Sequence, residues 1–201
     1  MITVIDYGLS NLASIENALE KLTIPYKVSS DPGIIKKADG LILPGVGAAM
    51  QGMKNLRQKG LDKTIREEVE KGKPILGICL GMQLLLSNSE EGNVTCLNII
   101  KGRVKKFNTT LKIPQIGWNN VSIRNRESLF LKDINDESYF YFVNSYACFP
   151  NDKNIITGIT NYGGNFCSFF VKDKIVGAQF HPEKSGDAGL QLLKNFWEAI
   201  E

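Results

Sequence analysis

The chain of 201 residues is 43% hydrophobic and 22% charged, a balance typical of a globular protein with a buried core. Its 24 Lys and Arg residues against 21 Asp and Glu residues leave a net charge of +3, too small to indicate nucleic-acid binding through a broad basic face. The length favours one domain, residues 1–201.

The N-terminus and the cysteines favour a cytoplasmic location. No basic segment or long apolar run follows Met1, so we expect no secretory signal. The least charged stretch, residues 74–89, is interrupted by Gly77 and Gly81 and does not match the roughly 20 apolar residues of a membrane span. The four cysteines lack a metal-ligand spacing such as Cys-x-x-Cys, and we expect them to be reduced.

Strand and helix patterns alternate through the first half of the chain. Apolar runs predict strands at residues 2–6, 26–29, 40–43 and 74–78. Apolar residues three and four apart predict helices at residues 12–22, 61–69 and 80–86, and a further helix that extends through residue 56. Near-continuous apolar strands that alternate with helices are typical of a parallel sheet covered on both faces.

The second half is richer in short β patterns. They lie at residues 103–107, 139–143, 155–160, 167–171 and 175–180, separated by Gly, Asn and Asp clusters typical of hairpins. A last helix is predicted, with a stripe of Leu190, Leu193, Trp197 and Ile200 and with Phe196 beside it. The predicted fold class is α/β: a doubly wound, mostly parallel sheet with helices on both faces and an antiparallel β extension.

The sharpest local motif is Gly77-Ile78-Cys79-Leu80-Gly81, between a buried strand and a helix. It has the pattern of a nucleophile elbow, with Cys in place of Ser. The glycines permit a tight turn that exposes the nucleophile, and the helix N-terminus that follows favours the thiolate. A buried structural cysteine is the alternative, and it is the commonest fate of a free Cys. The elbow pattern favours a nucleophile.

His181 is the only histidine, so any thiolate–imidazole catalysis must use it. It follows an apolar strand in the run Gln179-Phe180-His181-Pro182-Glu183. In an extended segment, the side chains of His181 and Glu183, two residues apart, point to the same side of the backbone. The carboxylate can there orient the imidazole. An unrelated His and a solvated Glu remain the alternative for this pair alone. Together with Cys79, the pair predicts a Cys-His-Glu triad.

Pro44-Gly45-Val46-Gly47 follows the predicted strand that we expect beside the Cys79 strand. Two glycines around one residue allow the backbone to direct an N–H into a cavity, as an oxyanion hole requires. A plain strand-to-helix turn is the alternative. A nucleotide site is disfavoured, because no Gly-x-Gly-x-x-Gly or Gly-x-x-x-x-Gly-Lys-Ser/Thr run follows a predicted strand.

Six segments that span the chain carry a family resemblance. They are Ile5-Asp6-Tyr7-Gly8, residues 43–47, residues 77–85, Gly117-Trp118-Asn119, residues 139–143 and residues 179–185. Together they resemble the class I (triad) glutamine amidotransferases, and within them the family of glutaminase subunits of imidazole glycerol phosphate synthase in histidine biosynthesis. The resemblance implies a flavodoxin-like core and neither a metal nor an organic cofactor.

The resemblance implies that Cys79 attacks the side-chain amide of glutamine, giving a glutamyl thioester and ammonia. His181 would move the proton and Glu183 would orient it. The remaining substrate-binding positions implied are Gly45, Val46 and Gly47 of the oxyanion segment, Gln83 one helical turn beyond the nucleophile, and Ser145 and Tyr146.

The resemblance also implies a partner. It is a cyclase subunit with a (β/α)₈ barrel, which forms a heterodimer with the glutaminase, receives its ammonia and rearranges its oxyanion segment. Asn11, Trp118 and Lys184 match interface positions. The chain has Gln115 and Asn144 where the family usually has His, Leu9-Ser10 where Met-Gly is usual, and Ala49 where Phe is common. These departures leave the triad intact but lie in segments that face the pocket or the partner.

Three alternatives stay open on the sequence. A paralogous glutaminase could feed ammonia to another acceptor enzyme, such as one that amidinates surface sugars. A γ-glutamyl hydrolase on a similar core is disfavoured by Met82-Gln83 and Lys184-Ser185. A non-enzymatic binding module is disfavoured by the place of the sole histidine.

Overall fold

The computed structural model describes residues 1–136 and 138–200. The first half alternates strand and helix as the periodicity predicts, and it contains one helix, Pro32–Lys37, that was not predicted. Its elements are β1 (Ile2–Ile5), α1 (Leu12–Lys21), β2 (Tyr26–Ser29), α2 (Pro32–Lys37), β3 (Gly40–Leu43), α3 (Ala49–Gln58), α4 (Leu61–Glu70), β4 (Ile75–Ile78) and α5 (Leu80–Leu84).

The second half is mostly strand and closes with a helix. Its elements are β5 (Asn88–Ser89), β6 (Val94–Thr95), β7 (Gly102–Lys106), β8 (Gln115–Asn120), β9 (Ser122–Ile123), η1 (Leu129–Leu131), β10 (Tyr139–Asn144), β11 (Tyr146–Pro150), β12 (Ile156–Asn161), β13 (Asn165–Lys172), β14 (Ile175–Ala178), η2 (Pro182–Lys184) and α6 (Gly186–Glu198).

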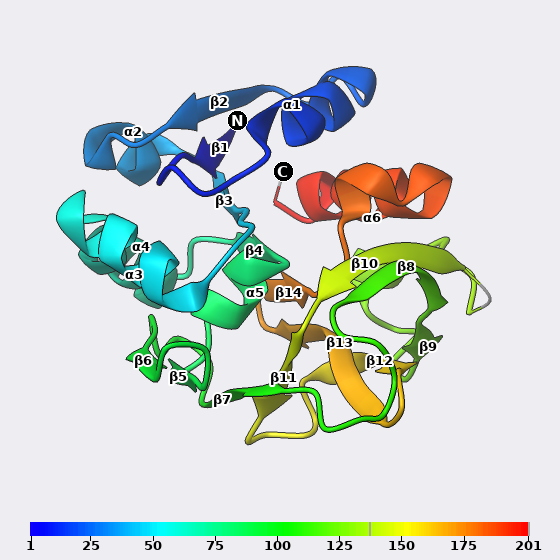
Figure 1. Ribbon diagram of the computed structural model, residues 1–201. Coiled ribbons are helices and arrows are strands. Elements are labelled where there is room, and N and C mark those ends of the chain that lie inside the picture. The colour runs from blue at the N-terminus through cyan, green and yellow to red at the C-terminus, as the bar shows by residue number, and fades with distance from the viewer. Residues whose placement is uncertain (137, 201) are drawn as a thin grey trace.

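The main sheet joins a parallel part to an antiparallel part (Figure 1). Strands β2, β1, β3, β4 and β14 lie in that order and run parallel to one another. Antiparallel strands β13, β11 and β7 continue the sheet from β14. The order of the five parallel strands is that of a flavodoxin-like doubly wound sheet. The predicted fold class, with its antiparallel extension, is confirmed.

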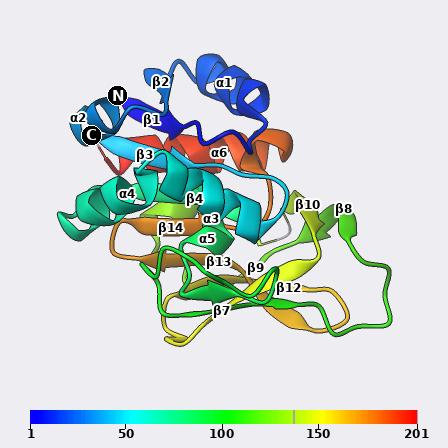
Figure 2. The ribbon, with the colours of Figure 1, turned by 60° about the vertical axis from the view of Figure 1, so that its left-hand side comes forward.

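Helices cover both faces of the parallel sheet, and β1, β3, β4 and β14 are buried along almost their whole length. Successive side chains of a strand point to opposite faces, so Leu76 and Ile78 of β4 enter one core and Ile75 enters the other. The core that contains Leu76 is closed by α1 and α6, and the opposite core by α2, α3, α4 and α5. Figure 2 shows α3 and α4 on the side of the parallel strands away from α6.

Strands β8 and β10 form a separate antiparallel pair. Phe140 and Phe142 of β10 point inward onto Phe180, with ring centroids 4.1 and 5.7 Å from it. The opposite side of the pair is exposed and apolar. We call this surface the β8–β10 apolar face, formed by Ile116, Trp118, Tyr139 and Val143.

Two expectations about local structure differ from the fold. The segment of β8, Gln115–Asn120, was expected only as part of a motif, because its amides and glycine have low strand propensity; pairing with β10 makes it a strand. The most buried side chains of α6 are Leu192, Leu193 and Phe196, whereas Leu190, Trp197 and Ile200 are only partly buried. None of the helices described is long and apolar enough to cross a membrane.

Candidate active site

The elbow at Cys79 is a tight turn between β4 and α5. Cys79 has a φ of 52°, a conformation that residues with a side chain rarely adopt. The flanking glycines are required by close approach of the backbone: a Cβ on Gly81 would lie 1.7 Å from the Leu43 carbonyl oxygen, and one on Gly77 2.8 Å from the Met82 nitrogen. The structure therefore forms the predicted elbow and turns Cys79 toward a cavity.

The parallel register of β4 and β14 brings the two distant motifs together. Ala178 pairs with Ile78 at the carboxyl ends of these strands, and the Cys79 N–H donates to the Ala178 carbonyl at 2.7 Å. The run that begins at Gln179 therefore starts beside Cys79. Cys79 and His181 line the same cavity.

The backbone and Glu183 both fix the position of His181. Its N–H donates to the Tyr141 carbonyl at 2.9 Å, and the Ser185 hydroxyl donates to the His181 carbonyl at 2.6 Å. Its Nδ1 lies 2.8 Å from Glu183 Oε1, and the side chains of the pair are 5% and 2% exposed. With Nδ1 held by Glu183, the Nε2 nitrogen is the one free for chemistry.

The charges around His181 stabilise its imidazolium form. Burial lowers the pKa of His181, but the charge of Cys79 and the hydrogen bonds with Cys79 and Glu183 outweigh burial and raise the pKa to about 10. Cysteine–imidazolium pairs of this kind activate the sulfur as a nucleophile. The geometry and charge therefore fit a thiolate–imidazolium pair oriented by a buried carboxylate.

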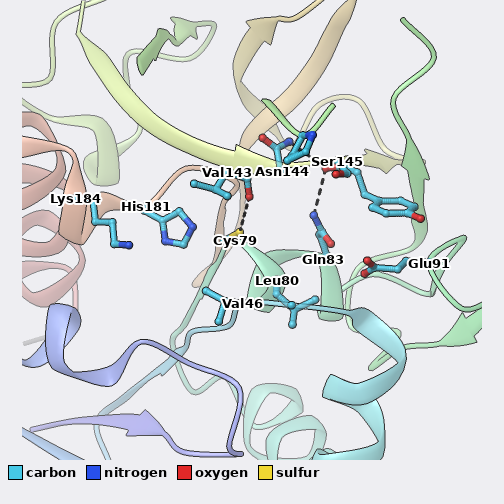
Figure 3. Close-up of a pocket in the computed structure, with 13 residues that line it drawn as sticks. Val46, Cys79, Leu80, Gln83, Glu91, Val143, Asn144, Ser145, His181 and Lys184 are labelled. Carbon is cyan, nitrogen blue, oxygen red and sulfur yellow. Dashed lines mark hydrogen bonds between the residues drawn. The ribbon is translucent and has the colours of Figure 1, made fainter. Parts of the chain in front are cut away.

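The cavity at Cys79 has a volume of about 310 Å³ (Figure 3). Five of the six predicted substrate-binding residues line it: Val46, Gly47, Gln83, Ser145 and Tyr146. Gly45 is not among the lining residues, and it lies beneath the cavity against Leu80 and Tyr7. Glu91, Pro114, Val143 and Asn144 line the cavity as well, and Lys184 is exposed at its edge.

Sequence reasoning missed Glu91, which faces the cavity from the turn between β5 and β6. Its Oε2 accepts a hydrogen bond of 2.7 Å from the Ala49 N–H at the start of α3. Glu91 therefore joins that turn to the segment that follows the oxyanion glycines. No motif surrounds Glu91 in the sequence, so only the tertiary fold could identify it.

The side-chain amide of Gln83 donates to two acceptors. Its Nε2 donates to the Tyr146 carbonyl at 3.3 Å and to Gln179 Oε1 at 3.0 Å, and Figure 3 shows its side chain extending toward the end of β10. The Ser145 carbonyl accepts from Phe107 N–H at 3.0 Å. Protein donors therefore occupy the carbonyls of Ser145 and Tyr146.

The backbone donors expected of an oxyanion hole are engaged within the protein. The N–H of Leu80, directly after Cys79, donates to the Gly45 carbonyl at 3.3 Å, and the Val46 N–H donates to the Leu9 carbonyl at 2.8 Å. The buried Tyr7 hydroxyl donates to the Pro44 carbonyl at 2.8 Å. A Cβ on Gly45 would lie 2.1 Å from that hydroxyl, so glycine is needed there. We call this arrangement of residues 44–47 the closed oxyanion segment.

The three predicted interface residues are exposed. Trp118 is 56% exposed within the β8–β10 apolar face, and Asn11 and Lys184 are also exposed. Lys184 ends η2, which packs against both α1 and β10 and so connects the region after Asn11 with the β8–β10 pair. Of the three residues, Lys184 also lines the cavity that contains Cys79.

The two amides that replace usual histidines are direct neighbours. Gln115 and Asn144 pair across β8 and β10, and both are buried. Asn144 Nδ2 donates to the Tyr146 carbonyl at 3.0 Å, while its Oδ1 and both amide atoms of Gln115 have no hydrogen-bond partner among the described residues. The pair lies beside the cavity without touching His181 or Glu183 through a hydrogen bond.

Three or more His, Cys, Asp or Glu side chains do not gather as a metal site anywhere in residues 1–136 and 138–200.

Comparison with known proteins identifies the family. The family model of class-I glutamine amidotransferases matches residues 3–200. The chain is 48% identical over 200 residues to the imidazole glycerol phosphate synthase subunit HisH of Moorella thermoacetica, covering 99% of this chain and 95% of that protein. The chain belongs to the class-I glutamine amidotransferases. HisH of Dehalococcoides mccartyi is 47% identical over 199 residues, covering 98% and 97% of the two chains.

A solved glutamine amidotransferase shares the fold of this class-I glutamine amidotransferase. The two superpose with a TM-score of 0.79 at 18% identity, covering 100% of this chain and 99% of the other. The predicted family, enzyme class and fold are confirmed by these comparisons. The roles of the individual site residues stay predictions.

Proposed function

We propose that the chain is the glutaminase subunit of an imidazole glycerol phosphate synthase and hydrolyses L-glutamine through Cys79, His181 and Glu183. The observation that carries the residue assignment is the parallel register of β4 and β14, which sets the elbow cysteine beside the strand that leads to the buried His–Glu pair. The identity of 48% to a HisH subunit over nearly the whole chain supports the choice of synthase.

The first half of the reaction uses the thiolate and the imidazolium. Cys79 Sγ attacks the side-chain carbonyl carbon of glutamine, and the carbonyl electron pair moves onto oxygen. The tetrahedral intermediate collapses as His181 Nε2 gives its proton to the departing nitrogen, releasing ammonia and leaving a glutamyl thioester on Cys79. Glu183 accepts a hydrogen bond from the Nδ1–H of His181 throughout and so keeps Nε2 directed toward the substrate.

The second half regenerates the enzyme. His181, now neutral, takes a proton from water, and the resulting hydroxide attacks the thioester carbonyl. Collapse of this second intermediate expels Cys79 as thiolate and releases glutamate. The carboxylate of Glu91 lies across the cavity and supplies a negative charge suited to the α-ammonium group of glutamine.

Both intermediates carry an oxyanion, and the closed oxyanion segment leaves it poorly stabilised. The Leu80 N–H is the donor expected from the residue after the nucleophile, but it is engaged with the Gly45 carbonyl. Turning the Gly45–Val46 peptide would release Leu80 N–H and present a second N–H to the cavity. One oxyanion donor is worth about 10²–10³ in rate, so the isolated subunit is expected to be slow.

The exposed β8–β10 apolar face supports the proposal that a protein partner binds this subunit. Four apolar side chains exposed together on one short strand pair are typical of an interaction surface. We infer that a (β/α)₈-barrel cyclase subunit covers this face, contacts Asn11, Trp118 and Lys184, receives the ammonia and opens the oxyanion segment. Glutamine is then consumed only when an acceptor is ready.

A paralogue that supplies ammonia to a different acceptor is the alternative, since Gln115 and Asn144 lie beside the pocket. The discriminating observation is which barrel protein stimulates hydrolysis. The HisH relatives favour the histidine-pathway cyclase.

The test of the nucleophile is glutamine hydrolysis by Cys79→Ala, with Cys96→Ala as the matched control. We expect Cys79→Ala to abolish ammonia release and to lose covalent labelling by an electrophilic glutamine analogue, while Cys96→Ala keeps both. Burial raises the pKa of the Cys96 thiol to about 12, so Cys96 is unsuited to nucleophilic attack. Ammonia release at the wild-type rate by Cys79→Ala would overturn the mechanism.

A further inference from the structure

Gln179 is a fully buried amide in direct contact with the nucleophile. It is 0% exposed, and its Nε2 lies 3.7 Å from Cys79 Sγ, within hydrogen-bond distance for a sulfur acceptor. It holds this position because β14 pairs in parallel with β4, so that the residue after Ala178 lies beside the residue after Ile78. None of the proposed proton and acyl transfers uses Gln179.

A chain of hydrogen bonds determines which end of the Gln179 amide faces the sulfur. The Tyr146 carbonyl can only accept, so Gln83 must present its Nε2 there at 3.3 Å. The same Gln83 Nε2 donates to Gln179 Oε1 at 3.0 Å. With its oxygen held by Gln83, Gln179 can direct only its Nε2 hydrogens toward Cys79.

The other polar neighbour of the sulfur favours the thiol. Cys79 Sγ lies 3.7 Å from the Val143 carbonyl oxygen, which can accept a hydrogen bond from the thiol but repels a thiolate. Gln179 Nε2 has the opposite preference, because a donor is attracted more strongly to a charged sulfur than to a neutral one. Gln179 and the His181 imidazolium are thus two side chains beside Cys79 that favour the thiolate.

We propose that Gln179 contacts the reacting sulfur as a fourth catalytic residue, donating a hydrogen bond that stabilises the Cys79 thiolate, and that Gln83 orients it. The hydrogen bond is strongest on the free thiolate, before attack and after release of glutamate, and weaker on the thioester sulfur. This inference rests on the proposed role of Cys79 as the nucleophile. It gives the buried Gln83–Gln179 pair a role in reactivity that is separate from substrate contact.

The test is the pH dependence of Cys79 alkylation by iodoacetamide, followed by mass spectrometry of the Cys79 peptide. Gln179→Met keeps roughly the length of the side chain and removes its amide, both the Nε2 that donates to Cys79 and the Oε1 that accepts from Gln83. Gln191→Met on α6 is the matched control, because Gln191 forms its hydrogen bond with Asn195 of the same helix. We expect the acid limb of the alkylation-rate profile to lie about one pH unit higher in Gln179→Met than in the wild type. At pH values below this limb, alkylation of Cys79 is then about tenfold slower, which corresponds to about 1.4 kcal/mol. Glutaminase kcat falls with it, while KM changes little.

A second measurement needs no variant. In wild-type protein labelled with ¹⁵N at glutamine side chains, the Gln179 Nε2 resonance is expected to titrate with the midpoint of Cys79 alkylation and to shift when Cys79 is alkylated. An unchanged acid limb in folded Gln179→Met would overturn the inference. A Gln179 Nε2 chemical shift that does not change with pH or with alkylation of Cys79 would also overturn it. The role of Cys79 as the nucleophile is tested separately by the Cys79→Ala assay, so the claim about Gln179 can fail while the claim about Cys79 stands.

Discussion

Replacing Glu183 by Gln should move the alkaline limb of glutaminase activity to lower pH. The carboxylate lies 2.8 Å from His181 Nδ1 and both side chains are almost completely buried, so water screens the pair little. A hydrogen bond to a charged group is worth about 1.5–3 kcal/mol, which corresponds to roughly 1–2 pKa units. Glu183 raises the pKa of His181, so its loss lowers that pKa.

The direction of the activity change follows from the proton that ammonia needs. His181 must be an imidazolium when the amide nitrogen leaves, and above its pKa it no longer is. With a lower pKa, Glu183→Gln loses activity at a lower pH, so its alkaline limb is displaced downward by about 1–2 units. Gln retains a carbonyl that can accept from Nδ1, so residual activity exceeds that of His181→Ala.

The assay is kcat/KM for glutamine between pH 6 and about 10.5 in the presence of the partner. Glu198→Gln is the control, because Glu198 is exposed on α6 and forms only a surface ion pair with Lys194. An unmoved or raised alkaline limb in folded Glu183→Gln, or greater damage than in His181→Ala, would refute the assigned roles.

Two further predictions concern coupling to the partner. Tyr7→Phe removes the hydroxyl that donates to the Pro44 carbonyl, a hydrogen bond worth about 0.5–1.5 kcal/mol, so glutaminase activity without the partner should rise about fivefold. Tyr26→Phe, which removes a hydroxyl bonded to Glu20, is the control, and an unchanged basal rate in Tyr7→Phe would contradict the closed oxyanion segment. Lys184→Glu should reduce stimulation by the cyclase subunit, measured by titration, more than it weakens glutamine binding; equal loss of both would remove Lys184 from the interface.

The parallel strands could be predicted because each carries its own signal. Continuous apolar runs at β1, β3 and β4 specify strands buried on both faces without reference to the rest of the chain. The elbow at Cys79 is equally local, since its glycines permit contacts that a Cβ would prevent. Geometry that depends on a few adjacent residues is therefore visible in the sequence.

The contacts across the cavity could not be predicted, because they depend on the order of strands in the sheet. Glu91 reaches the start of α3 from a turn after α5, and the Gln83–Gln179 hydrogen bond joins residues far apart in the chain. The engagement of Leu80 N–H by Gly45 is also a tertiary contact, and a glycine pattern alone fits an open and a closed segment equally well. The strand β8 was missed because its amide-rich residues depend on pairing with β10.

The central claim, that Cys79 and its neighbours form a glutaminase closed until a partner opens it, is tested most directly by one comparison. Glutamine hydrolysis is measured for the isolated subunit, and again with the histidine-pathway cyclase subunit of the same source and that subunit's ribotide ligand. The account predicts that both forms bind glutamine and that the complex hydrolyses it on the order of 10²–10³ times faster, the worth of one oxyanion donor. Full activity of the isolated subunit would contradict the closed segment, and stimulation by a different barrel protein alone would contradict the assigned synthase.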